Sequence, residues 1–328
     1  MVPRWTEYVN GGFLKETEAR ELESLAVDPL AMDDARLLTC STVLGKQVSQ
    51  EVTRYIVDAF RNAASLKCSD PELVKTVIKA IYHVIERFEG SPIHVDALFA
   101  MSRAVRENAN LSSESADIFF TVCRQALQTS SPELCIEALA ALAIVIEEPK
   151  LRLHFASNDR LLDVLVRALQ KFPNQPQLHY NAMLCFWLVS FDAESVKMIL
   201  QKWSSIVPLT VSICRATTKE KVIRMGVGLW RNLLEMEKNV VLPVLIGSRA
   251  LEFISNCVKK NFTDPDLSID LHHVHEELEK AITKLTTFDE YAGELKSGSL
   301  DWTPPHKSIL FWKDNANRLH ENNGELLK

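Results

Sequence analysis

Hydrophobic residues along most of the chain recur at every third or fourth position, which is the spacing of one face of an α-helix. The stretch that begins at Asp266 shows this spacing over several turns. Its apolar positions are Leu267, Leu271, Val274, Leu278, Ile282 and Leu285. Strict alternation of apolar and polar residues is scarce, and the chain has only 10 glycines and 13 prolines to form tight turns. The pattern predicts an all-α protein.

Capping residues mark the starts of several predicted helices. The segments Ser-Asp-Pro-Glu at 69–72 and Ser-Pro-Glu at 131–133 each place a short polar side chain before a proline and an acidic residue. The polar side chain accepts a hydrogen bond from a free amide of the first turn, and proline in that turn has no amide to satisfy. Both segments therefore predict a helix that begins at its proline.

Four predicted helices resemble one another, which indicates a repeat. "DPELVKTVIKAIYHVIE", "SPELCIEALAALAIVIEE", "QPQLHYNAMLCFWLVSF" and "TKEKVIRMGVGLWRNLLE" align when Leu73, Leu134, Leu178 and Val222 share one register, at distances of 61, 44 and 44 residues. The last two distances fall within the period of armadillo and HEAT repeats. The first is longer, so either an insertion follows the first helix or its register is wrong. Stacked repeats of this kind predict an armadillo/HEAT-like right-handed α-solenoid with a long concave groove.

Charge and cysteine content narrow the possible partners and the cellular compartment. The 37 basic and 43 acidic residues leave a net charge of −6, which argues against nucleic acid as a partner. The seven cysteines lie more than ten positions apart without a C-x-x-C pair, as expected of reduced thiols in a cytosolic core. The longest apolar run, Ala138–Ile146, is too short to cross a bilayer, so we expect a soluble protein without direct membrane insertion.

Motifs for catalysis or cofactor binding are scarce. No G-x-x-x-x-G-K, G-x-G-x-x-G or G-x-S-x-G occurs, so neither an enzyme nor a bound cofactor is expected. His272, His273 and His275 precede Glu276 and Glu279 on one predicted helix, but the zinc-protease pattern requires a histidine where Glu279 stands. A solvated polar face is therefore the favoured interpretation of this cluster, and a metal site is the alternative.

A basic strip and two tryptophans mark the predicted helix that starts near residue 220. The strip consists of Lys219, Lys221, Arg224 and Arg231, and it is either solvated surface or a binding site for an acidic partner. We take these four as the candidate partner-binding residues. Trp187 and Trp230 occupy matching places in the last two repeats, and because both lie in apolar stretches we expect them in the core.

The segment from Phe288 to Ala316 differs in character from the rest of the chain. "FDEYAGELKSGSLDWTPPHKSILFWKDNA" holds two of the six tryptophans and the Pro-Pro pair. It closely resembles the signature F-D-E-Y, E-L, W-[ST]-P-x-H and F-W-x-x-N of the H-subunit family of V-type proton ATPases. The matching residues are Phe288, Asp289, Glu290, Tyr291, Glu294, Leu295, Ser297, Trp302, Pro304, His306, Phe311, Trp312 and Asn315.

Further stretches are similar to the same family. "QLHYNAMLCFWLVSFD", "TKEKVIRMGVGLWRNLLE" and the opening "WTEYVNGGFLKETEA" each resemble a family segment, and together the specific matches cover under half of the chain. The resemblance implies a solenoid over residues 1–285, followed at 286–328 by a connector and the first helix of a second helical domain. In the family that domain extends beyond the position of Lys328, so we expect most of it to be absent here.

The resemblance also implies a function. Members of the family are non-catalytic regulatory and stator subunits of the vacuolar-type proton-pumping ATPase, and they couple ATP hydrolysis to proton transport. The implied partners are the peripheral-stalk subunits and the cytosolic collar subunit, on the cytosolic face of vacuolar or endosomal membranes. The family's C-terminal domain also braces the detached catalytic sector and silences it, a role not expected of a chain without most of that domain.

An armadillo-type cargo or trafficking adaptor that binds peptides is the alternative. Importin-like proteins line their groove with W-x-x-x-N, but no asparagine stands four positions after any tryptophan of this chain. Those positions hold Val9, Phe191, Val207, Leu234, His306 and Ala316. Asn232 instead fits the structural asparagine of armadillo repeats, so the sequence favours the pump subunit over the adaptor.

Overall fold

The computed structural model describes residues 5–28, 32–203, 205–260 and 262–285. Every regular element in these ranges is an α-helix, which confirms the predicted all-α class. The chain divides into two compact units, Met1–His275 and Glu276–Lys328. The domain division that the sequence predicts, at residue 285, stays a prediction.

The helices of the described residues follow one another with short connections. They are α1 (Trp5–Asn10), α2 (Glu16–Val27), α3 (Asp34–Leu44), α4 (Gln50–Asn62), α5 (Pro71–Arg87), α6 (Pro92–Glu107), α7 (Ser113–Gln128), α8 (Pro132–Ile146), α9 (Pro149–Ser157), α10 (Asp159–Lys171), α11 (Pro176–Val189), α12 (Ala193–Lys202), α13 (Ile206–Ala216), α14 (Glu220–Gly247), α15 (Ala250–Val258) and α16 (Pro265–Leu285).

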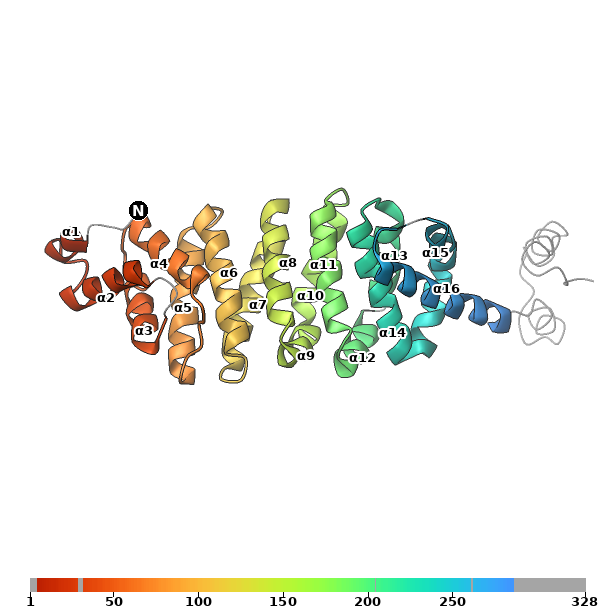
Figure 1. Cartoon of the computed structure of the whole chain (residues 1–328), viewed down its shortest axis with the longest axis horizontal. Helices are drawn as coiled ribbons and strands as arrows, with labels where there is room; N and C mark the ends of the chain where they lie inside the picture. Colours follow the sequence, from red (N-terminus) through yellow and green to blue (C-terminus); the bar gives the residue numbers. More distant parts are fainter. Residues whose placement is uncertain (1–4, 29–31, 204, 261, 286–328) are drawn as a thin grey trace, which may run out of the picture. The chain divides into compact units, whose positions relative to one another are not determined.

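Two layers of stacked helices run through the first unit. In one layer α4, α6, α8, α11 and α14 pack in succession, and in the other α3, α5, α7 and α10 do so (Figure 1). The helices of the first layer begin at residues 50, 92, 132, 176 and 220, so consecutive starts lie 40 to 44 residues apart. This spacing is the armadillo/HEAT period that the sequence predicted.

The predicted register was wrong for the first helix of the set. The helix that contains Leu73 is α5, which belongs to the second layer, whereas α6 is the neighbour of α8 in the first layer. The distance of 61 residues therefore arose from a wrong register. The apolar pattern did not reveal the error, because helices of both layers present an apolar face to the shared core.

Helix α8 shows why the chain contains its long apolar run. It packs against α6, α7, α9 and α11, so it is surrounded by protein along most of its circumference. Residues Ala138 to Ile146 supply seven of its buried side chains, and a helix enclosed in this way is expected to be apolar on nearly every face. The run of Ala138–Ile146 is therefore core.

The predicted helix starts are confirmed. The side chain of Asp70 accepts hydrogen bonds from the amides of Glu72 (2.9 Å) and Leu73 (3.0 Å), and α5 begins at Pro71. The hydroxyl of Ser131 accepts one from the amide of Leu134 (3.2 Å) at the start of α8. These contacts satisfy amides that have no partner within the helix.

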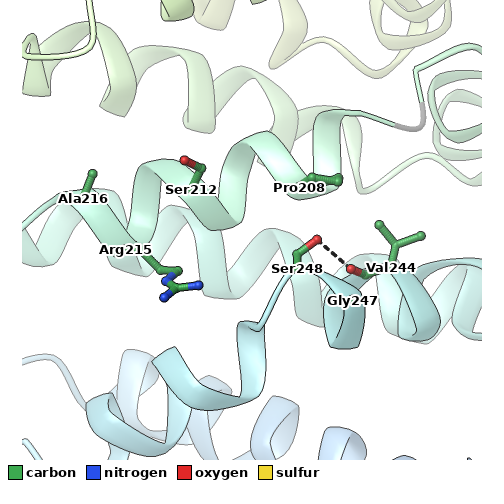
Figure 2. A pocket seen from close by; sticks show the side chains of 7 residues that line it. All are labelled: Pro208, Ser212, Arg215, Ala216, Val244, Gly247 and Ser248. Carbon is green, nitrogen blue, oxygen red and sulfur yellow. Dashed lines mark hydrogen bonds between the residues drawn. The ribbon is translucent and has the colours of Figure 1, made fainter. Parts of the chain in front are cut away.

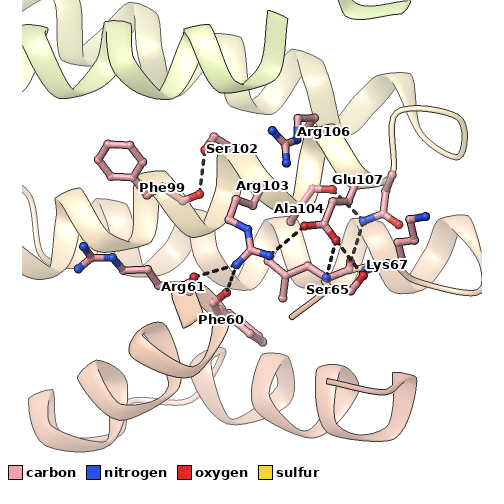
Figure 3. Close-up of polar contacts among 12 residues, drawn as sticks. Phe60, Arg61, Ser65, Lys67, Phe99, Ser102, Arg103, Ala104, Arg106 and Glu107 are labelled. Atoms are coloured by element: carbon pink, nitrogen blue, oxygen red, sulfur yellow. Dashed lines mark hydrogen bonds and ion pairs between the residues drawn. The ribbon is translucent and has the colours of Figure 1, made fainter. Parts of the chain in front are cut away.

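A polar network joins α6 to the segment that follows α4, one repeat earlier (Figure 3). Glu107 Oε2 accepts hydrogen bonds from the amide of Leu66 (2.6 Å) and the hydroxyl of Ser65 (2.9 Å). Its Oε1 accepts one from Arg103 (3.1 Å), and Arg103 also donates to the carbonyl of Arg61 (2.8 Å). The carboxylate thus fixes backbone as well as side chains of the neighbouring repeat.

Asn108 completes this network. Its amide nitrogen donates to the carbonyls of Leu66 (2.9 Å) and Ala104 (2.8 Å), and its oxygen accepts from the amide of Cys68 (2.8 Å). The residue is 3% exposed. We call Arg103, Glu107 and Asn108, together with the backbone of residues 60–68, the Glu107 clamp.

All seven cysteines are unpaired thiols, and six of them are buried, as the sequence predicted. Burial raises the pKa of the Cys40 thiol to about 12.

Within the described ranges no single helix is both long and apolar enough to cross a bilayer. The bent pair α14–α15, with 84° between its helices, passes the same test by length and composition.

Candidate partner-binding groove

The four candidate basic residues lie along the N-terminal half of α14, from its N-cap to Arg231. Lys219 is the N-cap residue, and the helix continues to Gly247 with its helical dihedral angles interrupted at Glu237. Lys219 and Lys221 are exposed, and neither forms an ion pair with another described residue. Two cations at the beginning of the strip are therefore open to solvent.

The two arginines of the strip are paired with carboxylates. Arg224 donates to Asp264 and to Asp266 (3.0 Å), which lie just before α16 and in its first turn. Arg231 donates to Asp270 of α16 (2.6 Å) and to Glu235 of α14 (3.1 Å). We call these contacts the α14–α16 bridge.

The carboxylates of the bridge offset the positive charge of the two arginines in the basic strip. The hydrogen bonds from Arg231 to Asp270 and Glu235 raise the pKa of its guanidinium further above the usual value, so this side chain stays charged. Each of the two arginines faces two carboxylates, which the sequence of α14 alone did not indicate. A role of the four basic residues in binding a partner stays a prediction.

The two matched tryptophans occupy different environments. Trp230 is fully buried, and its indole nitrogen donates to Thr210 Oγ1 (2.9 Å), which confirms its expected place in the core. Trp187 is only half-buried, so the same expectation was wrong for this residue. Its ring meets that of Phe191 edge to face with centroids 4.8 Å apart, and Phe191 is 48% exposed. The pair forms an aromatic surface beside α14.

Two glycines allow α14 to approach its neighbours closely. A Cβ atom on Gly226 would lie 2.3 Å from Cys214 Sγ, and one on Gly228 would lie 3.1 Å from Trp187 Nε1. The missing side chain of Gly228 therefore helps to determine where the Trp187 ring lies.

The aromatic pair and the bridge line one groove of about 440 Å³, which we call the α14–α16 groove. Its lining residues are Trp187, Phe191, Arg224, Met225, Gly228, Arg231, Asn232, Glu235, Asp266, Ile269 and Asp270. An adjoining hollow of about 480 Å³ shares Trp187, Arg224 and Met225 and adds Lys221. Asn232 donates to Ser190 Oγ at the end of α11 (2.9 Å), consistent with the structural role predicted for it.

A larger hollow of about 790 Å³ lies between α13 and the C-terminal end of α14 (Figure 2). It is lined by Pro208, Ser212, Arg215, Ala216, Val244, Gly247 and Ser248. The hydroxyl of Ser248 already donates to the carbonyl of Val244 (2.7 Å), and Arg215 lies 3.5 Å from Glu252. This hollow thus lacks the convergent charged and aromatic side chains of the α14–α16 groove.

The histidine cluster does not form a metal site among the described residues, where no group of three or more histidine, cysteine, aspartate or glutamate side chains is placed to hold an ion. His272 Nδ1 lies 2.7 Å from the carbonyl of Ser268, and His275 Nε2 lies 3.0 Å from Ser255 Oγ. The contact of His272 lies within α16, and that of His275 joins α16 to α15.

The connector signature lies outside the described residues. Its candidate residues are Phe288, Asp289, Tyr291, Glu294, Trp302, Pro304, His306, Phe311, Trp312 and Asn315.

Comparison with known families supplies the identity that the groove alone does not. The N-terminal family model of the V-ATPase H subunit matches residues 2–278, and the C-terminal model of the same protein matches residues 284–328. The chain belongs to the V-ATPase H-subunit family. The predicted resemblance is therefore confirmed, and it extends over the middle of the chain, where no specific motif was identified.

Relatives with curated names agree with this assignment. The chain is 28% identical over 297 residues to the first of the probable H subunits of the V-type proton ATPase of Caenorhabditis elegans, a match that covers 88% of this chain and 63% of that protein. It is 23% identical over 349 residues to the H subunit of the V-type proton ATPase of Drosophila melanogaster, and this match covers 99% of the chain and 72% of the relative. The chain thus spans about two thirds of the length of these relatives.

Solved structures support the fold. A designed armadillo repeat protein superposes with a TM-score of 0.53 at 15% identity, over 74% of this chain and 99% of the design. A second engineered protein gives the same score over 76% of this chain and 98% of its own length. At this level of identity the similarity shows the fold alone, an armadillo-like α-solenoid.

Proposed function

We propose that this member of the V-ATPase H-subunit family acts as a non-catalytic regulatory and stator subunit of the V-type proton-pumping ATPase. The main support is the ordered match of both domains of the family to consecutive parts of the chain. In this role the chain couples ATP hydrolysis to proton transport by binding the peripheral stalk and the cytosolic collar. It would do so at the cytosolic face of vacuolar or endosomal membranes.

The solenoid provides the surface for these contacts. Stacked helical repeats present extended faces that suit large partners. Lys219 and Lys221 are exposed at the start of α14 and unpaired among the described residues, so they are available to an acidic surface of the stalk or the collar. We propose that they make such a contact, while Arg224 and Arg231 shape the neighbouring groove.

Reconstitution tests the proposal. The full 328-residue chain is added to pump preparations stripped of their own H subunit, and ATP-driven proton transport and ATP hydrolysis are followed together. We expect the chain to bind and to raise the number of protons moved per ATP hydrolysed. Absence of recovered proton transport would contradict the proposed function.

A pair of matched variants tests the lysines in the same assay. The double variant Lys219→Glu/Lys221→Glu is expected to weaken binding to the pump and to leave the melting temperature unchanged, because exposed charges add little to stability. Arg54→Glu/Lys79→Glu, which reverses two exposed charges on α4 and α5, is the control. Equal loss of binding in both variants would show that only overall charge matters.

A peptide-binding adaptor is the second candidate function, and the half-buried Trp187 with the exposed Phe191 favours it. Copurification from cells distinguishes the two functions. Other pump subunits are expected to accompany a stator subunit, and cargo proteins without pump subunits would support the adaptor.

A further inference from the structure

The α14–α16 groove has the opposite charge from the one that the basic strip indicated. Arg224 and Arg231 are its two cations, and three carboxylates line it with them, those of Glu235, Asp266 and Asp270. A fourth carboxylate, Asp264, contacts Arg224 from the adjoining hollow. Four carboxylates contact the two guanidinium groups, and Lys221 and Glu220 of the adjoining hollow offset each other, so an excess of negative charge remains.

Much of this excess is open to a ligand. Asp266 and Glu235 have side chains that are 69% and 53% exposed. In the contacts of the bridge, Glu235, Asp266 and Asp270 each use one carboxylate oxygen, and the second oxygen has no donor among the described residues. Where these oxygens are exposed they are hydrated, and the donor of a ligand can reach them by replacing that water.

The aromatic side of the groove suits a positively charged ligand. Trp187 and Phe191 line it next to the carboxylates, and the guanidinium of Arg152 already lies 5.9 Å from the centre of the Phe191 ring. A cation is attracted to the face of such a ring, most strongly for tryptophan. Aromatic rings beside solvent-accessible carboxylates together recognise an ammonium or guanidinium group with an aliphatic stem.

We propose that the α14–α16 groove binds a lysine or arginine side chain presented by an extended segment of a partner protein. The proposal rests on the proposed role of the chain as a binding subunit, and it specifies the chemistry of one contact. The volume of about 440 Å³ accommodates a long basic side chain with neighbouring backbone. An acidic segment would meet the excess of carboxylates and is disfavoured there by repulsion.

Selection from a random heptapeptide library displayed on phage tests this chemistry. The immobilised full-length chain is the bait, and the strongest enriched peptide is then titrated in solution beside a version with its basic residues changed to glutamine. We expect enrichment of lysine and arginine, and a loss of affinity of about tenfold or more in the glutamine version, the size of a charge-assisted hydrogen bond. Enrichment of acidic or uncharged peptides, or no enrichment, would overturn the proposal.

Variants assign the binding to the groove. Glu235→Gln/Asp266→Asn should weaken binding of the selected peptide about tenfold, whereas Asp159→Asn, which changes an exposed carboxylate paired with Lys202, should not. Arg231→Gln should tighten binding by removing a competing cation, and an acidic ligand would show the reverse. Unchanged affinity in the double variant would also overturn the proposal.

The peptide assay and the pump reconstitution give separate answers. Peptide binding without recovered proton transport would sustain the groove and reject the proposed function. Recovered proton transport without a preference for basic peptides would support the proposed function and reject the proposed groove ligand.

Discussion

The Glu107 clamp and the α14–α16 bridge both connect neighbouring repeats, but their surroundings differ. In the clamp, Glu107 and Arg103 of α6 contact backbone about 40 positions earlier in the chain. In the bridge, Arg224 and Arg231 of α14 contact carboxylates about 40 positions later.

In the clamp, the side chain of Glu107 is 13% exposed and its oxygens accept from backbone and hydroxyl donors. In the bridge, the side chain of Asp266 is 69% exposed and accepts, among the described residues, only from Arg224, whereas those of Asp264 and Asp270 are 19% and 18% exposed. Asp264 also accepts from the amides of Asp266 and Leu267 at the start of α16.

The difference indicates which polar contacts are structural and which are available for binding. A buried acceptor that satisfies backbone amides cannot be removed without leaving those amides unpaired. An exposed ion pair contributes little to stability, because water competes for both partners. We therefore expect the clamp to hold the solenoid together and the bridge to shape a surface for partners.

The largest effect is expected from Asn108→Ala. The change leaves the amide of Cys68 without a partner and the buried carbonyl of Leu66 with only the Cys68 thiol at 3.7 Å, so the free energy of unfolding should fall by about 2 to 4 kcal/mol. Asn110→Ala is the control, because Asn110 is exposed and its side chain contacts Lys150 on the surface. Urea unfolding of both variants is the measurement, and equal losses would show that the clamp is not structural.

A smaller loss is expected from Gly226→Ala. The new Cβ would meet Cys214 Sγ at 2.3 Å and Met183 Cε at 2.8 Å in the core, so stability should fall by about 1 to 3 kcal/mol despite the better helix propensity of alanine. Urea unfolding measures this loss, and an unchanged midpoint would show that the core can expand at this contact.

Gly228→Ala is expected to weaken peptide binding with little change in stability. The Cβ of Gly228→Ala would meet the Trp187 ring at 3.1 Å, beside the groove. The free energy of unfolding should change by less than about 1 kcal/mol, while displacement of Trp187 shifts its fluorescence and weakens peptide binding. A large loss of stability with normal binding would contradict this view of the groove wall.

A double-mutant cycle measures the bridge itself. Arg231→Gln, Asp270→Asn and the double variant should give a coupling energy of about 0.5 to 1 kcal/mol in urea unfolding, the value of a partly exposed ion pair. A coupling as large as the loss in Asn108→Ala would remove the distinction between the two regions.

Mild acid should lower the stability through buried histidines that lie outside the clamp and the bridge, because neither of these contains a histidine. Burial lowers the pKa of His94 and of His179 below the ordinary value of 6.5, and no described residue hydrogen-bonds either ring nitrogen of His94. Below about pH 6.5 the unfolded chain binds protons that the folded chain does not, so stability falls as the pH falls. His94→Gln should flatten this dependence in unfolding curves recorded at several pH values, and an unchanged slope would assign the loss to other groups.

Local patterns were sufficient for much of the fold. The spacing of apolar residues predicted the helical class, and the capping residues Asp70 and Ser131 predicted two helix starts correctly. The register of the first repeat failed, because α5 and α6 carry similar apolar faces and only their packing shows which of them is the neighbour of α8. Trp187 was misplaced for a related reason, since an apolar stretch at the end of a helix can leave one side open.

The sequence by itself determined the all-α class, the repeat period of the last units and the family, because these depend on the order of residues along the chain. It also identified the cations of α14. Only the tertiary structure decided the charge of the groove around them. Stacking brings residues about 40 positions apart into contact, and thereby places Asp264, Asp266 and Asp270 against Arg224 and Arg231. A pattern within one helix cannot contain that information, because the charge that a partner meets is the sum over both repeats.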